Sequence, residues 1–391
     1  MKFLLIFTFG ILSTLAEGPS LLQEFSTGNN RFADSVYKQL LKSTSGNILI
    51  CPISAEIILA LARIGAKGRT AQQLSSGLHL PNDSDKIEEM ITTLIDYLGS
   101  GEAYTLKGVN KMYVDESFAI NEQFKNVAID IFDADIENVD FSHGSKAVSK
   151  INKWVEDKTE NNIKDLLKAS DVHSSTCALL VNALFFRARW ALSFKKRHTE
   201  KKPFYNNFDD SVDVDMMRLN EHFDYYESSD LNAKFLKLKY HGFDASMTIV
   251  LPNNQESLGA IEDNINKIFT APRFKKTYVK VTIPKFKLKT NYKLKQVLLA
   301  LGIRDAFESS ADFSDIGSDT TQQHLKIDEV IQNNLIEVDE HGTTAVSAAE
   351  ENLGLEHPPP NTATFIADHP FVFYIKKGNI VLFVGAIKEL P

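Results

Sequence analysis

EVDEHGTTAVSAAEENLGLEHPPPNTATFIADHPF, residues 337–371, is the stretch that decides how this chain is organised. It begins with apolar and acidic residues alternating around Val338, which is the period of a half-buried strand. Gly342 then introduces seven short residues, TTAVSAA, and later three consecutive prolines; a strand pattern returns at Phe371. A connection of this length without a regular period is usually either functional or disordered.

The composition predicts a folded, secreted protein. The chain has 391 residues, 43% of them hydrophobic, and a formal net charge of −8, which argues against non-specific binding to nucleic acid. Residues 1–16 resemble a signal peptide, with Lys2 before an apolar run and Thr14 and Ala16 at a cleavage site. The alternative, a membrane anchor, requires a longer run. We therefore expect one domain over 17–391, extracellular and without a membrane partner.

The cysteines and the single N-glycosylation sequon say less about function. Cys51 and Cys177 both lie in apolar surroundings, so we expect buried free thiols rather than a disulfide framework. The sequon at Asn82 marks an expected surface position, and we expect a glycan there.

Helical periods concentrate in the first half of the chain and strand patterns in the second. The expected helices include 53–63, 87–98, 148–167 and 292–301. Residues 178–186, ALLVNALFF, form a continuous apolar run that is typical of a strand buried on both faces. A hairpin is expected over 371–386, around the turn at Gly378. The fold class predicted from these patterns is α+β.

We find none of the short motifs that mark common catalytic or metal sites. HExxH, CxxC, GxSxG and the phosphate-binding loop are absent, and the ten histidines are scattered. We therefore expect neither an enzyme nor a metal site.

The segment 273–295 is rich in lysine and contains no acidic residue. One interpretation is the solvated face of a strand, because Lys285, Lys287 and Lys289 alternate with apolar residues. The other is a site for a polyanion such as heparin, formed by these three residues with Lys275 and Lys276. A second basic cluster, KKRH at 195–198, could extend such a site.

From Phe25 to its end the chain resembles a serpin. The resemblance rests on motifs spread along the chain in the family's order: NILICPIS at 47–54, GAKGRT at 65–70, INKWVEDKTENNIKDLL at 151–167, VNALFFRARW at 181–190, IPKFKL at 283–288, ADFSDI at 311–316, IEVDEHGTTAVSAA at 336–349 and ADHPFVFYI at 367–375. It implies the serpin fold, with three β-sheets, about nine helices and an exposed reactive loop at about 341–366.

The resemblance also implies a mechanism for the opening stretch. In serpins a protease cuts the loop and forms an acyl-enzyme, and the cut loop then inserts as a strand into the main sheet. The residues suit this mechanism, since Gly342 permits rotation at a hinge that begins at Glu340. The small residues that would share one face of the new strand are Thr343, Ala345, Ser347 and Ala349. A strand over 343–356 would reach roughly 46 Å at about 3.3 Å per residue.

Counting along the family's hinge places the cleaved bond between Glu356 and His357. Leu355 and Leu353 are the alternatives, and either would suit a chymotrypsin-like pocket. No Lys or Arg occurs between Lys326 and Lys376, so a basic cleavage site is absent. The expected partner is an extracellular serine protease, held in a covalent complex by a monomeric inhibitor.

The resemblance further implies a sheet-opening region that brings Cys51, Ser54, Asn182 and Gln332 together. In the family a serine is usual where Cys51 stands and a histidine where Gln332 stands. It also implies that Glu340 contacts Lys285.

Two functions stay open at this point: a secreted inhibitor of a clotting or immune protease cascade, needing no cofactor but accelerated by heparin, and a non-inhibitory serpin that acts as a carrier or storage protein. By alternation, Glu351 shares the face of Ala345 and Ala349, where burial of an acid is costly, and this favours the second.

Overall fold

The computed structural model describes residues 20–99, 104–207, 210–242, 244–270, 273–319, 324–343 and 359–391. Within these ranges the chain forms nine α-helices and three sheets. The helices are α1 (Leu21–Leu41), α2 (Pro52–Ile64), α3 (Gly68–Leu78), α4 (Ser84–Gly99), α5 (Glu122–Asp130), α6 (Gly144–Lys158), α7 (Leu258–Glu262), α8 (Ile265–Phe269) and α9 (Lys295–Ala300). The predicted α+β serpin fold is therefore confirmed.

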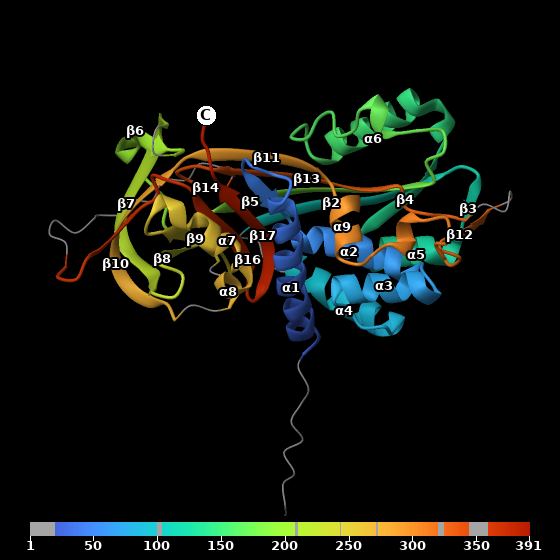
Figure 1. The fold of residues 1–391 in the computed structure, drawn as a ribbon, viewed down its shortest axis with the longest axis horizontal. Helices are drawn as coiled ribbons and strands as arrows, with labels where there is room; N and C mark the ends of the chain where they lie inside the picture. Colours follow the sequence, from blue (N-terminus) through green and yellow to red (C-terminus); the bar gives the residue numbers. More distant parts are fainter. Residues whose placement is uncertain are drawn as a thin grey trace, which may run out of the picture.

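The largest sheet has nine strands in the order β1-β17-β16-β9-β8-β7-β10-β15, with β6 paired to β7 beside this path. Its strands are β1 (Ile48–Ile50), β6 (Glu200–Tyr205), β7 (Ser211–Ser228), β8 (Ala233–Lys239), β9 (Ala245–Pro252), β10 (Lys275–Pro284), β15 (Ala363–Ile366), β16 (Phe371–Lys377) and β17 (Ile380–Ile387). The long strands β7 and β10 curve around one end of the molecule (Figure 1). The predicted hairpin is β16–β17.

The six-stranded sheet has the order β11-β13-β14-β5-β2-β4. Its strands are β11 (Phe286–Lys293), β13 (Glu329–Val338), β14 (Gly342–Thr343), β5 (Ala178–Arg189), β2 (Tyr104–Asp115) and β4 (Ala134–Val139). The strands β13 and β5 pair directly, and in parallel, along most of their length. The third sheet joins β12 (Gly317–Asp319) to β3 (Phe118–Ile120).

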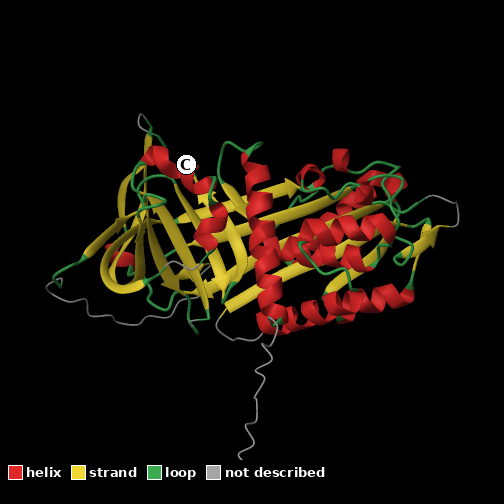
Figure 2. Cartoon of the chain, turned by 60° about the horizontal axis from the view of Figure 1, so that its bottom comes forward, coloured by secondary structure: helices red, strands yellow, loops and turns green. Residues whose placement is uncertain are grey.

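The six-stranded sheet lies between two layers of helix. One face carries α6, and α2 contacts β2 and β5 on the other, as Figure 1 shows. In Figure 2 the α2 side of the molecule is turned toward the reader, and its helices cover the strands over much of their length. The α6 face has its own apolar cluster, which includes Ile151 and Val155 of the helix and Leu179 and Val181 of β5. As expected, Cys51 and Cys177 are free and buried.

Two expected helices are shorter than their apolar period. The helix predicted over 148–167 ends at Lys158, because Glu160 and Asn161 adopt positive φ values of 52° and 62°. The helix predicted over 292–301 begins only at Lys295, because the preceding residues belong to β11. In both places apolar residues recur at helical spacing outside the helix, because they are selected for burial.

Of the described helices, none is long and apolar enough to cross a membrane. The predicted signal peptide at 1–16 lies outside the described residues.

Candidate functional site

The base of the opening stretch is a short strand held between two longer ones. Thr343 of β14 pairs with Val338 of β13 on one side and with Ala188 of β5 on the other. The β14 strand therefore enters the gap between β13 and β5 at the end where these two strands separate. Thr343 is 0% exposed, and its hydroxyl lies 2.8 Å from the hydroxyl of the buried Tyr240.

Gly342 is required by close approach as well as by its φ of +156°. A Cβ at this position would lie 2.0 Å from the carbonyl oxygen of Ala188 and 2.7 Å from the Cα of Arg189. Both are backbone atoms, so moving a side chain cannot relieve the clash. Any other residue would push β14 out of the gap.

A tight turn leads into β14 and is tied to the core by Trp190. The Asp339 carboxylate accepts hydrogen bonds from the backbone N–H groups of His341 (2.8 Å) and Gly342 (3.2 Å). The Trp190 indole donates to the Asp339 carbonyl at 3.0 Å, and its ring stacks on Tyr240 at 4.6 Å between centroids. The hinge is therefore anchored through backbone contacts.

Glu340 supplies a charged anchor at the same place. The predicted contact is present: Lys285 Nζ lies 3.0 Å from Glu340 Oε2, and the Thr199 hydroxyl donates to Oε1 at 2.7 Å. Burial alone would raise the pKa of Glu340, but the Thr199 hydrogen bond and the Lys285 ammonium outweigh it and lower the pKa. The carboxylate is thus held ionised by Lys285, which lies between β10 and β11, and by Thr199, which precedes β6.

The four residues named for sheet opening do meet. Gln332 of β13 donates through Nε2 to the Cys51 carbonyl (2.8 Å) and to Asn182 Oδ1 of β5 (3.2 Å). Asn182 Nδ2 in turn donates to the Ser54 hydroxyl. Cys51 and Asn182 are 0% exposed, and Ser54 and Gln332 are 2% and 1% exposed. The Gln332–Asn182 bond joins the two strands between which a loop strand would insert.

Neighbouring residues that the sequence did not single out complete this cluster. Asn182 Nδ2 also donates to Asn110 Oδ1 of β2 at 2.5 Å, and Asn334 Nδ2 donates to Gln332 Oε1 at 3.2 Å. The signal available in the sequence was an asparagine within a strand pattern, which must find a partner if buried. Only the fold shows which partner it finds.

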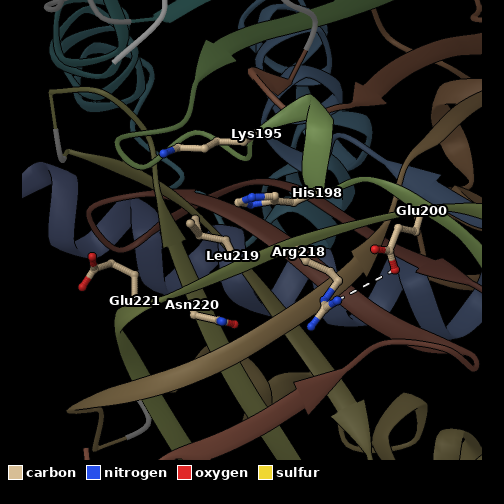
Figure 3. Close-up of a pocket in the computed structure, with 7 residues that line it drawn as sticks. All are labelled: Lys195, His198, Glu200, Arg218, Leu219, Asn220 and Glu221. Carbon is tan, nitrogen blue, oxygen red and sulfur yellow. Dashed lines mark ion pairs between the residues drawn. The ribbon is translucent and has the colours of Figure 1, made fainter. Parts of the chain in front are cut away.

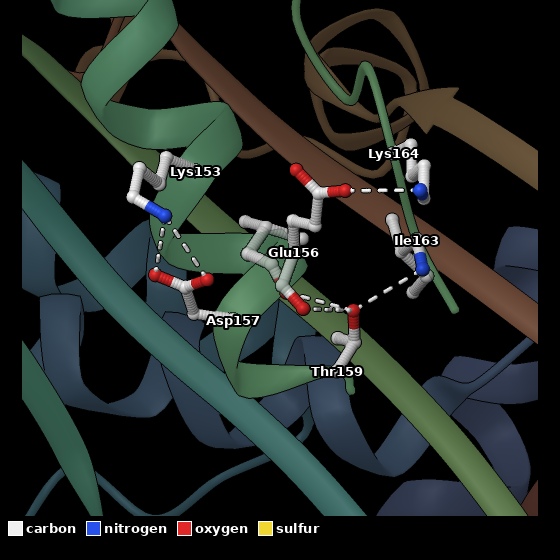
Figure 4. A network of polar contacts seen from close by, with 7 residues as sticks. Lys153, Glu156, Asp157, Thr159, Ile163 and Lys164 are labelled. Atoms are coloured by element: carbon white, nitrogen blue, oxygen red, sulfur yellow. Dashed lines mark hydrogen bonds and ion pairs between the residues drawn. The ribbon is translucent and has the colours of Figure 1, made fainter. Parts of the chain in front are cut away.

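The chain after α6 lies over the paired strands β5 and β13. Thr159 ends the helix: its hydroxyl donates to the Val155 carbonyl (2.7 Å) and accepts from the Ile163 N–H (3.1 Å), as Figure 4 shows. The following residues Ile163, Leu166 and Leu167 are buried against β5 and β13. We call α6 and the segment 159–172 the cover.

Polar contacts hold the cover on both sides of the paired strands β5 and β13. On the β4 side, Lys150 of α6 pairs with Glu137 at 2.6 Å. On the β11 side, Lys293 pairs with Asp171 at 2.6 Å and Asn291 Nδ2 donates to the Leu166 carbonyl at 2.9 Å. An inserting strand would have to pass beneath these contacts.

The basic residues proposed for polyanion binding come from two strands and the chain between them. Lys275 and Lys276 begin β10, whereas Lys285 follows that strand and Lys287 and Lys289 belong to β11. Three of the five are paired with acids: Lys276 with Asp224, Lys285 with Glu340, and Lys287 with Glu337.

The second basic cluster borders a pocket beside the hinge. Lys195, His198 and Arg218 line it together with Glu200 and Glu221 (Figure 3). Lys201 and Lys202 pair with Asp215 and Glu200. Acids therefore balance part of the positive charge of this region.

The residues of the loop itself lie outside the described part of the chain. This holds for the predicted bond Glu356–His357, for the alternatives Leu355 and Leu353, and for Ala345, Ser347 and Ala349 of the hinge. Asn82 is exposed just before α4. Within the described ranges no cluster of three or more potential metal ligands occurs.

A family model described as Serpin (serine protease inhibitor) matches residues 27–390. The chain is 30% identical over 372 residues to Antichymotrypsin-2 of Bombyx mori, covering 94% of this chain and 98% of that protein. Serpin48 of the insect Tenebrio molitor superposes with a TM-score of 0.89 at 38% identity, over 96% of this chain and 100% of that one. Human thyroxine-binding globulin shares the fold, with a TM-score of 0.84 at 24% identity over 95% of this chain and 99% of that one. This chain therefore belongs to the serpin family.

Proposed function

We propose that this serpin is a secreted suicide-substrate inhibitor of serine proteases. The observation that carries the proposal is the position of β14, whose two residues lie between β13 and β5 at the end of the gap. Extending this strand residue by residue would thread the small residues TTAVSAA along the gap. They enter a packed sheet without clash and lose little side-chain entropy.

The proposed reaction begins as ordinary proteolysis. The protease serine oxygen bonds to the carbonyl carbon of Glu356, the peptide bond to His357 breaks, and the His357 amine leaves with a proton. The loop then inserts and carries the ester-linked protease with it before water hydrolyses the ester. Mass spectrometry of the released C-terminal peptide identifies the bond: a start at His357 is expected, whereas a start at Glu356 or Gly354 would move it to Leu355 or Leu353.

The deciding assay is incubation with candidate serine proteases, followed by SDS electrophoresis. A covalent complex that survives SDS is expected. Thr343→Arg provides the control, because a guanidinium at a position that is 0% exposed blocks insertion and leaves a plain substrate. Cleavage of the unmodified protein without any complex would favour a carrier or storage protein. Thyroxine-binding globulin has the same fold, and its name states such a binding function. In a protein whose loop does not insert, Glu351 would be tolerated.

We further propose secretion and an extracellular protease partner within a clotting or immune cascade. The support is the pattern of residues 1–16, and the expected mature chain begins at Glu17. N-terminal sequencing of the exported protein tests this. We expect a glycan at Asn82 and a monomer.

A heparin-like polyanion is proposed as an accelerator rather than a required cofactor. Lys275 and Lys289 have no ion pair with any described residue, so they are the better candidates among the five lysines. Heparin should speed complex formation in a salt-sensitive way. Neutralising Lys275 and Lys289 together should remove the acceleration, whereas equal acceleration of that variant would rule out these residues as the site.

A further inference from the structure

A cavity of about 370 Å³ opens between α6 and the β4 edge of the six-stranded sheet. Its lining contains none of the described hinge residues 340–343. Its walls come from four parts of the fold: Asn110 of β2, Asp135 of β4, Trp154 and Lys158 of α6, and Ile129 of α5 with Asp133 after it.

Asn110 links this cavity to the sheet-opening cluster through one side chain. It is 8% exposed, and its oxygen accepts the hydrogen bond from Asn182. The amide NH₂ group of Asn110 can still donate, because no described residue accepts a hydrogen bond from it. A ligand that accepts from this group would strengthen the bond to Asn182, because hydrogen bonds in a chain polarise one another.

The cavity carries one carboxylate and one ammonium that have no ion pair with any described residue, Asp133 and Lys158 of α6. Asp135 is neutralised by Lys111, whose Nζ lies 2.9 Å away and whose side chain is only 5% exposed. Asp133 has no ion pair with any described residue. A ligand ammonium could approach this carboxylate without displacing an existing partner.

The remaining wall is apolar and aromatic. Ile129 is 48% exposed at the cavity, which is unusual for so large an apolar side chain. The Trp154 indole forms the α6 side, with Lys111 Nζ 4.9 Å from its centroid. An aromatic ring would cover this wall and remove apolar area from water.

We propose that the cavity binds a small aromatic amine that carries a hydrogen-bond acceptor, and that occupancy holds the sheet closed. The ligand would contact α6 and the sheet together, so it fixes the cover over the gap between β5 and β13. It binds the closed form and thereby stabilises that form by mass action. This second half rests on the proposed function, since it concerns insertion of the loop strand.

The binding half is tested by calorimetry on the full chain with a matched pair of probes. Tyramine carries the ring, the hydroxyl and the ammonium, and 3-(4-hydroxyphenyl)propionate carries the same ring and hydroxyl with a carboxylate. Tyramine should bind through Asp133, whereas any binding of the acid should depend on Lys158 and be lost in Lys158→Met. Asp133→Asn should abolish tyramine binding, whereas Asp130→Asn, an exposed carboxylate on α5 outside the cavity, should leave it unchanged. Absence of tyramine binding, or tyramine binding that survives Asp133→Asn, would overturn the site.

The regulatory half is tested by the rate at which a synthetic peptide of residues 343–356 inserts into the intact protein, followed as resistance to urea. Tyramine at ten times its Kd should slow insertion by up to ~11-fold if only the closed form binds it. The Asp133→Asn variant should insert the peptide at one rate with or without tyramine. Bound tyramine that leaves the rate unchanged, or raises it, overturns the regulation. If the peptide does not insert even without tyramine, the proposed function fails, while calorimetry still decides the site.

Discussion

At the residue scale, Glu56 is a carboxyl group placed fully inside the core. It is 1% exposed on α2, and Asn29 Nδ2 donates to its Oε2 at 2.6 Å. Its Oε1 has no hydrogen-bond partner among the described residues. Burial raises the pKa of Glu56 well above its usual value, and the Asn29 hydrogen bond offsets this only in part.

This burial predicts a loss of stability with rising pH. The folded pKa lies above the unfolded one, so the folded state binds more protons, and stability falls as pH rises from the unfolded pKa through the folded pKa. A pKa that differs by one between the folded and unfolded states changes the free energy of unfolding by about 1.4 kcal/mol. Glu56→Gln should therefore gain stability over the unmodified chain at pH 8 relative to pH 5 in urea unfolding. Exposed Glu89→Gln is the control; an equal difference at both pH values for Glu56→Gln would contradict the argument.

Gly342→Ala tests the close approach at the hinge. The new Cβ would clash with the Ala188 carbonyl, so β14 should leave the gap at a cost of about 1–3 kcal/mol, typical of overpacking. The Trp190 indole, which donates to the Asp339 carbonyl, should then report a shifted fluorescence emission. Gly259→Ala, where a Cβ meets nothing within 4 Å, should leave the emission unchanged. An unshifted spectrum for Gly342→Ala would show that β14 tolerates a side chain.

At the scale of elements, we expect the cover to restrain opening of the sheet. Asp171 is the acid of the Lys293 ion pair; burial alone would raise its pKa, but the Lys293 and Lys168 interactions outweigh burial and lower it. The pair is therefore intact at neutral pH and weakens as pH falls through the lowered pKa of Asp171. It ties the cover to β11, across the gap from the contact between Lys150 and Glu137.

Lys293→Met should speed insertion of the 343–356 peptide. Lys293 is 53% exposed, so the pair is worth at most about 1 kcal/mol, which corresponds to roughly a fivefold change in rate. Lys153→Met is the matched control, because it breaks an ion pair with Asp157 within α6 and frees no element (Figure 4). Equal rates for the two variants would mean that this contact does not restrain the cover.

At the scale of the whole molecule, the sequence predicted which helices and strands form better than where each of them ends. The apolar run at 178–186 identified β5, because a strand buried on both faces needs continuous apolar residues. The end of α6 was missed, since Ile163, Leu166 and Leu167 keep a helical period while lying in irregular chain. Burial sets that period, and the positive φ values that stop the helix leave no apolar signature.

The contacts of the candidate site were also predicted only in part. The resemblance located Glu340, Lys285 and the four residues of the sheet-opening region, all of which meet in the structure. It did not identify Asn110 or Thr199, because each joins these contacts only through a partner distant in sequence, Asn182 and Glu340 respectively.

The central claim is that the cut loop becomes a strand between β5 and β13. The direct measurement is thermal unfolding before and after the loop is cleaved within residues 353–357. About ten new backbone hydrogen bonds at about 1 kcal/mol each, in a chain whose Tm rises by about 1 °C per kcal/mol, predict an increase on the order of 10 °C. Thr343→Arg should show no such increase. A cleaved but otherwise unmodified chain with the same Tm as the intact chain, or a lower one, would contradict insertion.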